Sequence, residues 1–169
     1  MKFRAAAVLI PVLLVSGFLE TRAQAKFDKA IKAATAVYES GDYEEASELF
    51  EKFRIKAERK LGKQNRYTIS YLLAKARIGL AQGMTTDFEN YLQQATKLSL
   101  ASNPNGGEDH AFVLVEAADL LRRQGNINQA LQGIDQAKLS LRGLPKPNQA
   151  LTGKIDLVYA ECLTAQGYY

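Results

Sequence analysis

The sequence contains no tryptophan, a single cysteine, Cys162, and a single histidine, His110. One cysteine excludes a disulfide within the chain. One histidine with no cysteine beside it supplies too few ligands for a zinc site, which needs several side chains in a set geometry. We therefore expect no metal site and no cofactor.

A strong excess of charge of either sign is also absent. The formal net charge is +4, and it falls to +2 without residues 1–25, which hold Lys2, Arg4 and Arg22 against Glu20. A balance this small favours neither a nucleic acid nor a membrane surface as partner. Charged residues make up 24% and hydrophobic residues 47% of the 169 residues, as in ordinary globular chains, and this length suits one domain.

The only long apolar run lies near the N-terminus and resembles an export signal. Basic residues in positions 1–4 precede a fourteen-residue apolar run, 5–18, which Pro11 interrupts, and Ala23 and Ala25 fit the small-x-small cleavage rule. The run is shorter than the roughly 20 residues that span a bilayer, although an uncleaved anchor is the alternative. A lipid anchor is not expected, because no cysteine lies near this cleavage site. We predict cleavage between Ala25 and Lys26, export to the periplasm or medium, and no stable membrane insertion afterwards.

Residues 26–169 contain an internal repeat with a period of 42 residues. Glycines recur at this interval, and other positions keep phase with them; an alanine stands seven residues before each glycine and an aliphatic residue ten before. The glycines are Gly41, Gly83, Gly125 and Gly167, the alanines Ala34, Ala76, Ala118 and Ala160, and the aliphatic residues Ile31, Leu73, Val115 and Leu157. A constant period between 20 and 50 residues is typical of stacked helical repeats.

Each unit is predicted to be a pair of helices, because apolar residues precede and follow the glycine at helical spacing. The glycine ends the first helix, and a capping residue opens the second. Asp42 with Glu45 and Asn126 with Gln129 fit the capping pattern, whereas Thr86 with Glu89 offers it two residues late. The predicted helices are 27–40, 43–61, 67–82, 86–101, 109–124, 127–141 and 149–166.

The repeat resembles the tetratricopeptide repeat (TPR), over about Phe27 to Tyr169. The residues that carry the resemblance are Ala34, Gly41, Tyr43 and Ala46 in the first unit and Ala118, Gly125, Ala130 and Ala137 in the third. The period of 42 is similar to the kinesin-light-chain subtype, which does not imply a motor. The resemblance implies an all-α, right-handed solenoid of about 3.5 repeats that binds a protein or peptide. The units are about 27–66, 67–108, 109–148 and an incomplete 149–169.

Two departures from the TPR pattern carry expectations of their own. Phe88 stands where the family prefers alanine, so we expect splayed helices or a longer turn in the second unit. The fourth unit has its first helix but no second one, which leaves an end through which the chain can self-associate. We expect the chain to be a fragment of a longer repeat protein, or to be covered there by another chain. The alternative is that the last helix is itself the cap.

The TPR resemblance also implies a concave peptide-binding face on the first helices of successive units. Arg77 and Arg122 would hold a carboxylate, whereas Tyr38 and Phe112 would offer apolar anchors. The chaperone-binding clamp of two lysines and asparagines is not reproduced. The positions carried onto this face are Tyr38, Ser70, Leu73, Arg77, Phe112, Asp119, Arg122, Lys154 and Glu161.

The sequence shows no catalytic constellation. His110 follows Glu108 and Asp109, which favour the start of a helix, and Cys162 lies on an apolar helix without a nearby base. We therefore expect no enzyme but a scaffold or adaptor outside the cytoplasm that binds a protein or peptide. The alternative is the N-terminal sensory or interaction portion of a larger signalling or membrane-associated protein whose downstream domain is absent here.

Overall fold

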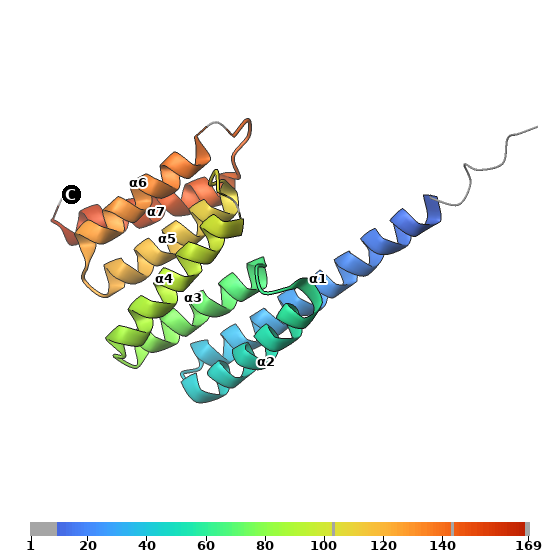
Figure 1. Ribbon diagram of the computed structural model, residues 1–169. Helices are drawn as coiled ribbons and strands as arrows, with labels where there is room; N and C mark the ends of the chain where they lie inside the picture. Colours follow the sequence, from blue (N-terminus) through green and yellow to red (C-terminus); the bar gives the residue numbers. More distant parts are fainter. Residues whose placement is uncertain (1–9, 103, 143, 168–169) are drawn as a thin grey trace, which may run out of the picture. The chain divides into compact units, whose positions relative to one another are not determined.

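The computed structural model describes residues 10–102, 104–142 and 144–167, with side chains from Gln24 onward. These residues form seven α-helices and no strand, which confirms the predicted all-α class. The helices are α1 (Ile10–Glu39), α2 (Tyr43–Leu61), α3 (Arg66–Ala81), α4 (Thr85–Ser102), α5 (Glu108–Arg123), α6 (Ile127–Leu141) and α7 (Gln149–Ala165) (Figure 1). From α2 onward, each boundary lies within one residue of its predicted position.

The first helix is longer than predicted. α1 begins at Ile10 instead of Phe27 and runs through Ala25 and Lys26 without a break. Pro11 lies in its first turn, where a proline costs no intrahelical hydrogen bond, so no residue of this segment interrupts the helix. Residues 1–9 lie outside the described part. None of the helices among the described residues is both long and apolar enough to cross a membrane.

The chain divides into two compact units within α2, between Phe53 and Arg54. The first unit has its own small core, in which the rings of Phe27 and Phe53 meet edge to face with centroids 5.9 Å apart. Ala34 and Ala46, two of the residues that carry the repeat pattern, are fully buried there. This helix pair therefore packs as the repeat pattern predicts.

Besides the end of α2, the second compact unit is built from two helix pairs and a single helix. α3 pairs with α4 and α5 pairs with α6, and α7 packs on both α5 and α6 (Figure 1). The first helices of successive units also contact one another, α3 with α5 and α5 with α7. A continuous core of buried residues joins the last three helices, with Val115, Ala118, Ile134 and Ile155 among its members.

The turns between paired helices repeat with the glycines. Gly41, Gly83 and Gly125 have φ of 89°, 72° and 92°, a left-handed conformation that only glycine adopts without strain. The amide of each glycine donates to the carbonyl three residues earlier, at 3.0, 3.1 and 2.9 Å. The next helix starts two residues after each glycine. The period of 42 is therefore a repeat of backbone geometry as well as of sequence.

The second repeat, made of α3 and α4, keeps this geometry, so the expected splaying or longer turn is wrong. α4 begins at Thr85, 42 residues after the start of α2, and Phe88 is completely buried beside Gly79. Because residue 79 is a glycine, the backbone of α4 at Phe88 can approach α3 closely. The late cap predicted at Thr86 is also wrong, because Thr86 lies inside α4.

The other two predicted caps differ from each other. The carboxylate of Asp42 accepts from the amide of Glu45 at 3.0 Å, as the capping pattern predicts. Asn126 makes no side-chain cap; its Nδ2 amide group donates to the Gln124 side-chain oxygen at 2.9 Å. The turn hydrogen bonds alone therefore suffice to start α6 in the repeat geometry.

The last helix differs from its equivalents in exposure. Ala76 and Ala118 are fully buried under the second helices of their own pairs, whereas Ala160 of α7 is exposed. Leu157 and Tyr159 are also exposed, at 59% and 36%. Among the described residues, no second helix covers this side of α7.

Candidate functional site

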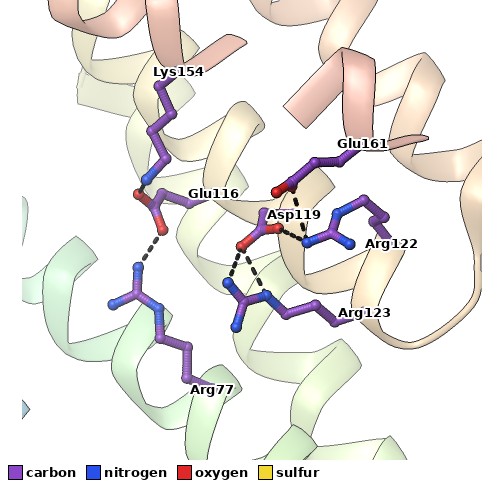
Figure 2. A network of polar contacts seen from close by, with 7 residues as sticks. All are labelled: Arg77, Glu116, Asp119, Arg122, Arg123, Lys154 and Glu161. Carbon is purple, nitrogen blue, oxygen red and sulfur yellow. Dashed lines mark hydrogen bonds and ion pairs between the residues drawn. The ribbon is translucent and has the colours of Figure 1, made fainter. Parts of the chain in front are cut away.

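The candidate site is a surface built by the first helices of three successive units, α3, α5 and α7. It contains four cationic and three acidic side chains, which form two neighbouring clusters (Figure 2). Five of these seven residues were predicted from the repeat to lie on the binding face. The structure brings together Arg77 from α3, Glu116, Asp119, Arg122 and Arg123 from α5, and Lys154 and Glu161 from α7.

Glu116 is the centre of the first cluster. One carboxylate oxygen accepts a hydrogen bond from Arg77 and the other accepts one from Lys154, so this side chain joins α3, α5 and α7 (Figure 2). Its side chain is only 5% exposed, whereas the two cationic side chains are 34% and 37% exposed. A buried carboxylate is costly unless it is paired, and here each oxygen has a cationic donor.

Asp119 is the centre of the second cluster. It accepts from Arg122 at 2.7 Å and from Arg123 at 2.9 Å, and Arg122 also reaches Glu161 of α7 at 3.0 Å. Burial alone would raise the pKa of Asp119, but the hydrogen bonds and charges of the two arginines outweigh it and hold that pKa below its ordinary value. The carboxylate is thus ionised and fixes both guanidinium groups.

The pairing changes what the arginines are available for. Arg77 and Arg122, predicted to hold a ligand carboxylate, hold the chain's own carboxylates instead. A guanidinium has five N–H donors and an ammonium has three, so Arg77 and Lys154 each keep donors beyond the one that Glu116 uses. Because both side chains are partly exposed, these donors are accessible on a surface whose geometry is already fixed.

An aromatic side chain borders the first cluster. Phe112 of α5 is 41% exposed, and the ammonium of Lys154 lies 5.5 Å from the centroid of its ring. This distance is within the range of a cation–π interaction, which holds the lysine beside the ring. The surface therefore combines an exposed apolar group with ordered cationic donors.

The remaining predicted face residues do not join this surface. Leu73 is 2% exposed and belongs to the core, which corrects its predicted place on a binding face; an apolar residue facing the helix pair gains more by burial than by exposure. The Ser70 hydroxyl donates to the Arg66 carbonyl within α3. Tyr38 lies in the other unit, where its ring packs against Tyr43 at 5.5 Å.

Glu116 was not predicted, although the sequence carries a signal for it. It stands nine residues before the turn glycine, where the neighbouring units have Ala74 and Val158, both buried. The first repeat has an exposed lysine in this slot, but a buried acid between apolar equivalents requires cationic partners. The repeat places Arg77 and Lys154 on the flanking helices, so a search for charges out of pattern would have found the cluster.

The single histidine and cysteine are both buried. The His110 Nδ1 lies 2.8 Å from the Ser99 hydroxyl, and that hydroxyl also lies 2.9 Å from the Thr96 carbonyl oxygen. Desolvation lowers the pKa of His110 and raises that of the Cys162 thiol. Ser99 and Cys162 are 0% exposed, which makes the first a link between α4 and α5 and the second a core residue, as predicted.

Metal-ligating residues do not gather either: within residues 24–167, apart from 103 and 143, no three His, Cys, Asp or Glu side chains lie together as ligands. Neither a family model nor a curated protein matches the sequence. The resemblance to TPR proteins therefore rests on the residues and on the repeated turn geometry alone.

Proposed function

We propose that the chain is a TPR-like repeat domain of the kinesin-light-chain-like subtype, a right-handed α-solenoid of about 3.5 repeats, and that it acts as a non-enzymatic scaffold or adaptor. The observation that carries the proposal is the surface of α3, α5 and α7, in which successive units present charged groups that are already fixed in position. Pre-ordered donors reduce the entropy lost when a partner binds.

The ligand that suits this surface best is a polypeptide segment. Phe112 supplies exposed apolar area, and the unused donors of Arg77 and Lys154 suit backbone carbonyls or an acidic side chain. The four cations face three carboxylates, so little net charge remains for non-specific attraction. Binding is then expected to depend on shape and hydrogen bonds more than on ionic strength.

A random peptide library displayed on phage tests the proposal, with the purified chain as bait. We expect selected peptides to lose at least about tenfold in affinity for Phe112→Ala and for Arg77→Ala, since each removes a contact of about 1.4 kcal/mol or more. Leu100→Ala is the matched control, because Leu100 is comparably exposed at 46% but lies on α4. Peptides that bind Phe112→Ala as tightly as the unchanged chain would contradict the proposed site.

We also propose that the chain is cleaved between Ala25 and Lys26 during export, so that the scaffold acts in the periplasm or medium. Both residues are exposed, so a peptidase could reach the bond after local opening of α1. The intact mass of the chain recovered from the exported fraction tests this. A mass that begins at Lys26 is expected, and a mass that includes residues 1–25 would reject the cleavage.

The exposed side of α7 favours the second candidate, the N-terminal sensory or interaction portion of a larger signalling or membrane-associated protein. Leu157, Tyr159 and Ala160 occupy the side that second helices cover on α3 and α5. A further helix, from another protein or another copy of the chain, would bury this side. Sedimentation of the unchanged chain and of Leu157→Glu tests for self-association. A concentration-dependent dimer only in the unchanged chain is expected if a second copy supplies that helix.

A further inference from the structure

A groove on a different side of the second unit combines aromatic walls with cationic side chains. It has a volume of about 580 Å³ and is lined by the end of α2, the following link, α3 and α4. Ligand sites for small molecules commonly have volumes of roughly 300–1,000 Å³. None of its lining residues belongs to the surface of α3, α5 and α7 described above.

The walls of the groove are aromatic and aliphatic. Tyr71 and Leu72 of α3 and Tyr91 and Leu98 of α4 line it. Tyr71 is held by the guanidinium of Arg54, whose carbon lies 5.3 Å from the ring centroid. The apolar walls therefore have a fixed geometry and favour a flat or aliphatic group between them.

The charge of the groove is positive. Arg54 is paired with Glu58 at 2.8 Å, which neutralises the acid that lines the groove. Lys63 and Lys97 line it too, and neither ammonium has a carboxylate partner within the described part of the chain. Two uncompensated cations beside an apolar cleft attract an anion that carries an apolar body.

We infer that this groove binds a small organic anion, with its apolar body between Tyr71 and Tyr91 and its carboxylate or sulfonate between Lys63 and Lys97. The site is independent of the proposed peptide-binding surface. Leu98 and Leu72 would contact the apolar body, and Ala101 also lines the groove. Affinity for such a ligand should fall as salt screens the two lysines.

Two fluorescent probes of nearly equal shape test the inference. 8-Anilinonaphthalene-1-sulfonate carries an anionic group, and N-phenyl-1-naphthylamine is the same ring system without it. We expect one molecule of the sulfonate to bind per chain, at least about tenfold more tightly than the neutral probe. Equal affinity for both probes would overturn the inference, because apolar area alone would then explain binding.

Matched variants locate the probe. Lys63→Glu and Lys97→Glu should each weaken sulfonate binding about tenfold or more, whereas Lys146→Glu, which makes the same change outside the groove, should not. Ala101→Trp should fill the groove from an exposed position and abolish binding, and Ala165→Trp is its control on α7. Since neither alanine is buried, both tryptophan variants should fold. Sulfonate binding unchanged in Ala101→Trp would overturn the inference.

Discussion

Gly79 on α3 and Phe88 on α4 lie in direct contact at the crossing of their two helices. A Cβ atom built on Gly79 would lie 3.2 Å from the backbone nitrogen of Phe88, and the ring of Phe88 is fully buried. The equivalent pairs, one period away on either side, are Val37 with Ala46 and Leu121 with Ala130. In the second repeat the small residue of the pair therefore lies on the first helix and the large one on the second helix, the reverse of the other two repeats.

This exchange predicts strong coupling between the two positions. Gly79→Leu should destabilise the fold because its side chain would push against the backbone of α4, which the buried Phe88 ring holds in place. Phe88→Ala should cost about 3–5 kcal/mol by leaving a cavity, and without the ring α4 can shift to admit the leucine. The double variant recreates the Leu121–Ala130 pair of the next unit. We expect it to be more stable than the sum of the single effects by at least about 1 kcal/mol, measured by urea unfolding.

A distant residue provides the control for this cycle. Ile155 lies in the core of α7 and is 1% exposed, so Gly79→Leu combined with Ile155→Ala should be additive. Additivity of Gly79→Leu with Phe88→Ala would show that the two sizes do not compensate each other.

His110 predicts a fall in stability in mild acid. Its pKa is lowered by burial in the folded state, so the unfolded chain binds more protons and stability rises with pH. The stability that the neutral His110 ring contributes is fully present above the ordinary pKa of 6.5, and it is lost as the pH falls through the lowered pKa. The free energy of unfolding measured from pH 5 to 8 should show this slope, and His110→Gln should remove it. An equal slope in both chains would contradict the burial of a neutral ring.

Asp119 predicts a second loss at lower pH. Its pKa lies below the ordinary 3.8, so its contribution is present above that value and lost as pH falls through the lowered pKa. Asp119→Asn should destabilise the chain by about 1–2 kcal/mol at pH 7, since Arg123 is largely solvated, and the difference should vanish in strong acid. Urea unfolding from pH 2 to 7 checks this. The same change at Asp135, which is exposed, should have little effect at any pH.

The Cys162 thiol should become reactive only when the chain unfolds. It is fully buried, and burial raises its pKa, so little thiolate forms and reagents cannot reach it. A disulfide reagent such as Ellman's should react at a rate that follows global unfolding. Thr152→Cys, an exposed position on α7, should react at once in a Cys162→Ala background. Rapid labelling of Cys162 in the folded chain would show that α7 opens locally.

The helices could be predicted from the sequence because the residues that indicate them are local and repeated. Positive-φ glycines and small residues keep phase over 42 residues, so the bounds from α2 to α7 follow closely. Sequence reasoning missed the accommodation of Phe88, because that depends on Gly79 in a different helix, and Gly79 reads in the sequence as an ordinary helical residue. Packing across a pair is not visible in either helix alone.

The sequence predicted where the candidate surface lies, but it did not predict which groups its cationic side chains bind. The period puts Arg77 and Lys154 on one face, yet their common partner, Glu116, lies in a slot that is apolar in the repeats on either side. Whether a cation faces a ligand or a neighbouring carboxylate depends on distances between helices. The groove lined by Tyr71 and Tyr91 was missed for the same reason, because its residues lie on different helices and have no common period.

The central claim is that Glu116 joins α3, α5 and α7 into one continuous surface. Hydrogen exchange of the unchanged chain and of Glu116→Gln, measured by mass spectrometry, tests it most directly. Loss of the carboxylate's charge should increase exchange in all three helices together, whereas Asp135→Asn on α6 should change little. Faster exchange confined to α5 would contradict the claim, because Arg77 and Lys154 would then contribute nothing to holding the neighbouring units.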